Sequence, residues 1–140
     1  MAEFTSTTIQ TVASGQNLSL TETAVKGTNC IVHREGAGNV TLRGLTNQCK
    51  AVFRVSFGGN IAIPTGGTVG AISVALAVGG EALNSATAIV TPAAVDQYSN
   101  VFTAVFVEVP RGCCVTVALK NTSTQAISIA NANLVIERTA

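Results

Sequence analysis

The chain of 140 residues is 47% hydrophobic and only 11% charged, whereas an average protein has about 25% charged residues. Its formal net charge is +1, and its eight basic residues are scattered along the sequence, so no basic stripe supports nucleic-acid binding. The longest apolar run, Ala71 to Val78, is far shorter than the roughly 20 residues that span a bilayer, and the first residues lack a signal-peptide pattern, so neither a membrane span nor export is expected.

Apolar residues alternate with a period of two along most of the chain, and no segment has a convincing period of 3.6. The pattern predicts strands at residues 6–12, 17–22, 30–35, 39–44, 49–63, 68–78, 87–91, 99–109, 114–121 and 125–138. Turn sequences separate them, and residues 91–99, the one candidate for a helical turn, are too few to matter. Eight to ten short strands without helices predict a single all-β domain over residues 1–140, a β-sandwich or jelly roll, in which residues 1–6 are expected to form a flexible arm.

Cys30 and His33 form a C-x-x-H spacing on a predicted strand, where side chains three residues apart point to opposite faces. A structural zinc site has four ligands, so these two would converge with Cys49 and with Cys113 or Cys114 only through tertiary folding. A disulfide between Cys30 and Cys49 is a second alternative. The ordinary interpretation is a set of thiols that pack as small apolar residues.

Two turns carry charged tips. Arg34 and Glu35 precede the sequence Gly-Ala-Gly-Asn, and Arg111 lies inside Pro-Arg-Gly. Loop tips are common binding sites, so these three side chains are candidates for contact with a receptor, a glycan or a capsid. Solvated turn residues are the ordinary interpretation of the same pattern.

Both faces of the predicted strand at residues 99–109 are mainly apolar. Val101 and Val107 point one way, and Phe102 and Phe106 point the other. A strand with one face in water alternates between apolar and polar residues, so this strand is expected to be covered on both sides. One cover is the core. The other is a neighbouring subunit, with Phe102 and Phe106 as anchors, or a long loop of the same chain. The shortage of charge favours the subunit, with an adhesive, apolar exterior as the alternative.

Cys113 and Cys114 stand side by side between the Pro-Arg-Gly turn and the next predicted strand. Neighbours on a regular strand point to opposite faces, so both thiols do not face one metal ion there, and a disulfide between neighbours is strained. We therefore expect one cysteine in the core and the other at a subunit interface. The preceding Pro-Arg-Gly turn allows an irregular backbone, which leaves the shared metal ion and the disulfide between neighbours as alternatives.

Catalytic groups are sparse. His33 is the only histidine, the seven acidic residues are isolated from one another, and the glycine-rich turns lack the helix that a phosphate-binding loop needs. The sequence predicts no enzymatic activity, no cofactor and no metal.

Three stretches carry a resemblance to a known family: residues 109–140, which contain the Pro-Arg-Gly turn, an Asn-Thr-Ser hairpin and the closing Ala-Asn-Leu-Val-Ile-Glu-Arg; the glycine-rich residues 55–94; and residues 33–44. Together they resemble tumour-necrosis-factor-like and complement-head-like jelly-roll proteins encoded in phage and prophage structural-gene regions. The resemblance runs from about residue 8 to residue 140, and no catalytic motif is part of it.

The resemblance implies a homotrimer around a three-fold axis and a structural role on a virion as a capsid decoration, head fibre or tail-associated protein. Its partners would be itself, a major capsid or tail protein, and a host-surface glycan, after synthesis in the host cytoplasm. A carbohydrate- or receptor-binding head is an alternative. A spore or cell-surface component is another, although the chain lacks the collagen-like Gly-X-Y stem of the spore type.

Overall fold

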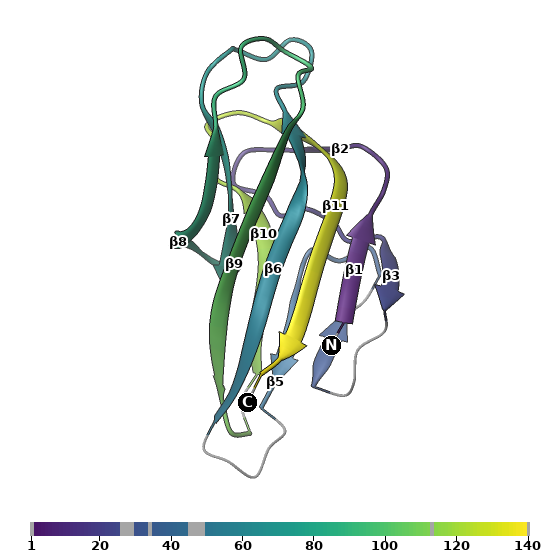
Figure 1. Cartoon of the computed structure of the whole chain (residues 1–140), viewed down its shortest axis with the longest axis vertical. Helices are drawn as coiled ribbons and strands as arrows, with labels where there is room; N and C mark the ends of the chain where they lie inside the picture. Colours follow the sequence, from purple (N-terminus) through teal and green to yellow (C-terminus); the bar gives the residue numbers. More distant parts are fainter. Residues whose placement is uncertain (1, 26–29, 34, 45–49, 113, 140) are drawn as a thin grey trace.

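Two antiparallel β-sheets pack face to face (Figure 1) in the computed structural model, which describes residues 2–25, 30–33, 35–44, 50–112 and 114–139. The six-stranded sheet has the order β3-β1-β11-β6-β9, with β2 also paired to β11; its strands are β1 (Ala2–Ser6), β2 (Gln10–Val12), β3 (Glu22–Val25), β6 (Lys50–Ala62), β9 (Ser99–Pro110) and β11 (Ile127–Arg138). The five-stranded sheet has the order β4-β5-β10-β7-β8; its strands are β4 (Ile31–His33), β5 (Val40–Arg43), β7 (Ile72–Val78), β8 (Glu81–Val90) and β10 (Cys114–Asn121). None of the described residues forms a helix that is long and apolar enough to cross a membrane.

The core lies between the two sheets and follows from the period-two pattern. On β6, Phe53, Val55 and Phe57 are fully buried while the residues between them face outward. Leu76 of β7 and Leu134 of β11 belong to the same buried cluster, so both sheets contribute to one core.

The sequence predicts the bounds of two strands closely. The predicted strand at 114–121 has the bounds of β10, and the one at 99–109 differs from β9 by one residue. The expectation of a flexible arm at residues 1–6 is wrong for the described residues 2–6, which form β1. That strand pairs with β11 and β3 and buries Phe4 and Ser6. Pairing with a strand at the other end of the chain therefore orders this segment.

The segment at 17–22 departs from the prediction in another way. Leu18 and Leu20 are buried as the alternation indicates, yet β3 begins only at Glu22. The amides of Leu18 and Leu20 donate instead to the carbonyls of Leu119 and Ala37, at 2.9 and 3.2 Å. The apolar pattern thus predicts the buried face but not a paired strand.

A buried asparagine organises the hairpin between β10 and β11. Asn121 is 1% exposed, and its side-chain amide donates to the carbonyls of Val12 and Gln125 at 2.9 and 3.0 Å. Its side-chain oxygen accepts from the amide of Ser123 at 2.9 Å. The Ser123 hydroxyl in turn donates to the carbonyl of Ser73 on β7 at 3.0 Å. The Asn-Thr-Ser sequence therefore joins both sheets at one end of the molecule.

Gly44 marks a close approach between the two sheets at the other end. It follows β5, and its carbonyl accepts from the amide of Gly112 at 3.3 Å. A Cβ on Gly44 would lie 2.3 Å from the carbonyl oxygen of Pro110, which is backbone and cannot rotate away. We expect Gly44→Ala to lower the free energy of unfolding by about 2–3 kcal/mol, measured by urea titration.

Gly70 provides the matched control for this substitution. A Cβ there would meet nothing within 4 Å, so Gly70→Ala should leave stability unchanged or raise it by up to about 1 kcal/mol. Equal effects of the two substitutions would contradict the close approach at Gly44.

Candidate self-association surface

The six-stranded sheet has a face that points away from the core, called the outer face below. It carries Phe102, Ala104 and Phe106 of β9, Arg54, Ser56, Gly58 and Asn60 of β6, and Asn133, Val135 and Glu137 of β11. The strand register aligns these residues in rows across the sheet, because paired residues on neighbouring strands share a face.

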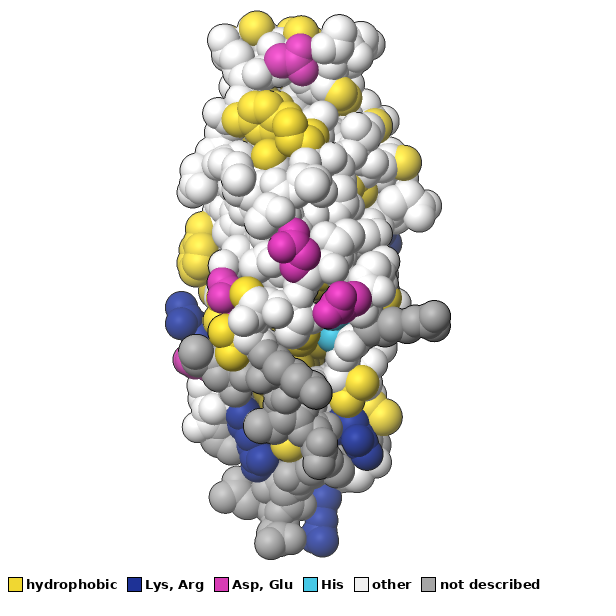
Figure 2. All heavy atoms as spheres, turned by 90° about the vertical axis from the view of Figure 1, so that its right-hand side faces the viewer, with side chains coloured by type: hydrophobic (Ala, Val, Ile, Leu, Met, Phe, Trp, Pro, Cys, Tyr) yellow, Lys and Arg dark blue, Asp and Glu magenta, His cyan; other side chains and the backbone are white. Residues whose placement is uncertain are grey.

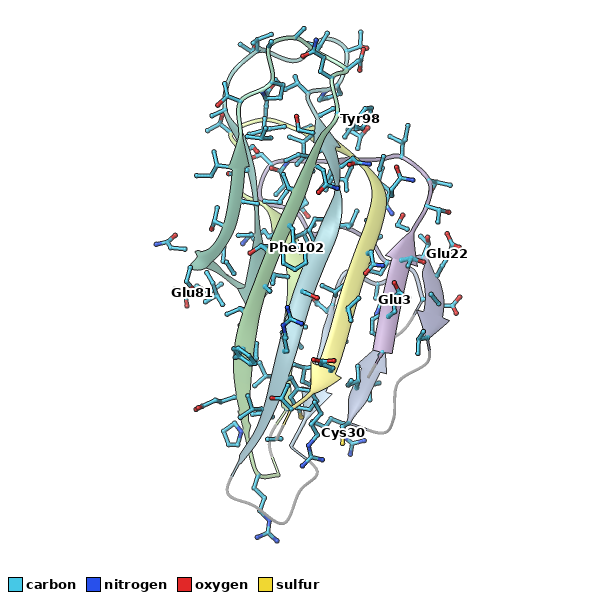
Figure 3. All side chains as sticks on the ribbon, viewed as in Figure 1. Glu3, Glu22, Cys30, Glu81, Tyr98 and Phe102 are labelled. Carbon is cyan, nitrogen blue, oxygen red and sulfur yellow. The ribbon has the colours of Figure 1, made fainter. Side chains whose placement is uncertain are left out.

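Two phenylalanines dominate the apolar surface of the outer face. Phe102 and Phe106 are 61% and 65% exposed, whereas Val101, Val107 and Val109 on the same strand are buried (Figure 3 labels Phe102). The sequence predicts this division of β9 into two faces. Within the described chain no loop covers the two rings, so the interpretation as a strand covered by its own loop is not what the structure shows.

Small residues lie beside the two rings. Gly58 pairs with Phe102, and a Cβ on Gly58 would be 3.9 Å from the Phe102 ring. Ser56 pairs with Ala104 and with Val135 on the next strand. The outer face therefore has bulky rings along its edge strand. Beside them lies a flatter, weakly polar strip around Gly58 and Ser56, called the floor below.

Side-chain amides form a row above this floor. The amide of Asn100 on β9 donates to Asn60 on β6 at 3.3 Å, and Asn60 donates to Asn131 on β11 at 3.2 Å. Farther across the same face, Asn133 on β11 donates to the carboxylate of Glu3 on β1. These polar side chains bond to one another. The charged residues of the outer face include Arg54 and Glu137, which lie opposite each other on β6 and β11.

The edge of the sheet adds to the same surface. β9 pairs with β6 over 12 residues without a bulge, and among the described strands β6 is its only hydrogen-bonded partner. Native edge strands are usually short, bulged, charged or covered, because an open edge invites pairing with another chain. β9 is long and regular, Glu108 is its one charged residue, and part of the strand contacts β8 of the other sheet.

Cys114, one of the two candidate interface cysteines, does not join this surface. Cys114 is exposed at the start of β10, opposite Arg43 on β5, so it lies on the other sheet from Phe102 and Phe106. Cys113, expected to share the interface or the core, lies outside the described residues, as does Cys49. Cys30 is half-buried, and its sulfur is 3.9 Å from a guanidinium nitrogen of Arg138.

The charged loop tips are not brought together either. Glu35 is exposed in the turn before β5, and Arg111 is exposed in the turn before β10. Gly44, which follows β5, lies against Pro110, so the two tips lie near opposite ends of β5. Arg34 lies outside the described residues.

His33 is bound by backbone groups. Its Nδ1 is 3.2 Å from the carbonyl oxygen of Asn39, its Nε2 is 3.1 Å from that of Leu20, and its ring centroid is 4.5 Å from the ring of Phe4. A neutral ring can donate to one of these carbonyls, and a protonated ring can donate to both. His33 therefore links β4 to three other segments, and in the described part of the chain no three His, Cys, Asp or Glu residues are placed to hold a metal.

The described structure also has an open hollow of about 450 Å³ at the end that carries the β10–β11 hairpin, lined by Thr68, Val69, Gly70, Ala71, Thr124 and Gln125. The side chain of Gln125 spans it, accepting from the amide of Thr68 at 2.9 Å and donating to the carbonyl of the same residue at 2.7 Å. The amide that could recognise a ligand there is already used within the loop.

Comparisons with known proteins give the fold. No protein-family model matches the chain, and no curated protein matches it either. Among solved structures, the Eiger TNF of S. frugiperda is similar with a TM-score of 0.70 and 15% identity, covering 99% of this chain and 91% of that one.

Two further structures agree. The globular domain of zebrafish complement 1qA has a TM-score of 0.60 at 7% identity, covering 96% of this chain and 94% of its own. Murine APRIL has a TM-score of 0.56 at 10% identity, with 95% of both chains covered. At identities this low, the similarity supports a shared fold and nothing more. The chain has the all-β jelly-roll fold of tumour-necrosis-factor-like and complement-head-like domains, as the sequence predicts.

Proposed function

We propose that the chain is a non-enzymatic structural subunit that assembles as a homotrimer through the outer face. The observation that carries the proposal is the pair of exposed rings, Phe102 and Phe106, on the long edge strand β9. Exposed apolar clusters on a chain with few charges mark surfaces that other protein covers.

The arrangement favours contact between different parts of two copies. The rings stand at the edge of the sheet, and the floor around Gly58 and Ser56 lies toward its centre. A contact of the edge of one copy with the floor of the next joins two different patches, and such contacts close into a ring when the rotation permits. A closed trimer, which the family resemblance implies, is a ring of this kind.

The setting we propose is the surface of a phage or prophage particle, as a capsid decoration, head fibre or tail-associated protein. The support is the resemblance of residues 33–44, 55–94 and 109–140 to proteins of that kind, together with the fold. Mass spectrometry of purified particles tests this setting, since a virion protein is present in stoichiometric amount and a spore or cell-surface component is not.

The mass of the purified protein in solution tests the assembly. We expect light scattering to give the mass of three 14.2 kDa chains, with or without reductant. A monomer would overturn the proposal. If adding reductant is enough to dissociate the trimer, then disulfides between subunits hold it together, and contacts of the outer face do not.

A further inference from the structure

Three arginines form an arc around one end of the sandwich. A guanidinium nitrogen of Arg138 is 3.9 Å from the sulfur of Cys30, and the backbone amide of Arg43 donates to the carbonyl of Cys30 at 2.7 Å. Gly44, next in sequence, lies against Pro110, and Arg111 follows in the same turn. The arc therefore runs from β11 across β5 to the turn between β9 and β10.

The fold separates charge along the long axis of the molecule. Arg54 on the outer face adds a fourth exposed guanidinium near this end, and the carboxylates beside it are those of Glu108 and Glu137. Figure 2, in which basic side chains share one colour, shows them gathered toward this end and most of the acidic side chains farther along. Basic residues that are scattered in the sequence are thus assembled by strand pairing.

The residue type narrows the chemistry of a partner. Among the side chains that the structure describes, the cations of this end are all arginines, and Lys120 lies elsewhere, with its Nζ 3.3 Å from the carbonyl of Gly80. A guanidinium offers a planar fork of donors that matches the two oxygens of a carboxylate or a phosphate, which an ammonium does not. A patch of one sign also raises the rate at which an oppositely charged partner arrives.

We infer that the arginine arc, with Arg43 and Arg111 at its centre, binds an acidic, carboxylate-rich segment of another protein. The chain has a formal net charge of only +1, so it lacks the excess of positive charge that marks nucleic-acid-binding proteins. Glu108 and Glu137 stand among the arginines. A peptide can place its carboxylates opposite the arginines and avoid the two glutamates. This inference deepens the proposed function, on which its setting rests, because it gives the subunit a means of attachment to a particle protein.

A peptide-binding experiment tests the arc without particles. The probe is a fluorescein-labelled peptide of alternating glutamate and serine, and fluorescence anisotropy reports its binding to the full chain at low salt. We expect binding that weakens as salt is added, and a roughly five- to tenfold loss of affinity in Arg43→Gln/Arg111→Gln. A double variant with the same change in net charge, Asn84→Glu/Ser85→Glu on the exposed part of β8, is expected to keep most of the affinity.

Each other outcome overturns the inference. Equal losses in the two double variants would show a response to net charge alone, and tighter binding of a DNA oligonucleotide of the same charge would assign the arc to phosphates. If the labelled peptide does not bind to the wild-type chain, the arc is not a docking surface for acidic segments. Light scattering on the same samples separates these failures from failure of the proposed trimer, since Arg43 and Arg111 lie off the outer face.

Discussion

Phe102→Glu/Phe106→Glu is expected to convert the assembled protein into a folded monomer. Each phenylalanine that is buried in a contact stabilises it by roughly 1.5–3 kcal/mol, and each glutamate placed there costs several kcal/mol more unless it finds a partner. A ring of three such contacts does not survive both changes. Light scattering should give the mass of one 14.2 kDa chain, with a circular dichroism spectrum like that of the wild type.

The fold itself should tolerate these substitutions, because Phe102 and Phe106 are 61% and 65% exposed in the isolated chain and the core faces the other side of β9. Val32→Glu/Val69→Glu is the matched control: both valines are exposed, and neither belongs to the six-stranded sheet. That variant should keep the wild-type mass. A trimer that persists in the phenylalanine variant, or dissociates equally in the control, would contradict assembly through the outer face.

The fold could be predicted where one side of a strand faces the core. β6 and β9 alternate between buried and more exposed residues, and their bounds follow closely from that alternation. β1 could not be found in this way, since Phe4 is its only large apolar residue and its order comes from pairing with β11, more than a hundred residues away. Non-local pairing has no signature in a short window of sequence.

The candidate surface could be predicted only in part, for the same reason. Phe102 and Phe106 stand out on one strand, so the sequence identifies them. The floor around Gly58 and the amide row through Asn60 depend on which strands are neighbours. The arginine arc is the clearest case, because Arg43, Arg111 and Arg138 meet only through the contacts of Cys30 and Gly44.

The burial of a polar hairpin loop is another feature that the sequence does not predict. The Asn-Thr-Ser sequence is identified only as a hairpin, yet Asn121 and Ser123 are 1% and 7% exposed and link β2, β7 and β10. The same Asn-Thr-Ser sequence is found in hairpins exposed to solvent and in buried hairpins that link strands. Which of the two forms depends on whether the backbone carbonyls of Val12 and Gln125 have another donor, and that depends on the tertiary structure.

Asn121→Asp is expected to lower the free energy of unfolding by about 3–5 kcal/mol, although it changes only an amide group into a carboxyl group of the same shape. The amide donates to a buried carbonyl, that of Val12, at 2.9 Å, and to a partly buried one, that of Gln125, at 3.0 Å. A carboxylate would present oxygen to both, so each carbonyl loses its hydrogen bond and a negative charge is buried beside them. Urea titration at neutral pH measures the loss.

Asn17→Asp separates this cause from the added charge. Asn17 is exposed, and its amide is 3.4 Å from the side-chain oxygen of Asn39 in solvent, so that variant should stay within about 0.5 kcal/mol of the wild type. Equal losses at positions 17 and 121 would assign the effect to net charge. A stable Asn121→Asp would mean that the hairpin can turn its side chain to water, and the buried asparagine would then not be what joins the sheets. The expected difference between the two variants follows from geometry alone, because the same chemical change is made at a buried donor with two acceptors and at an exposed one with a single long contact.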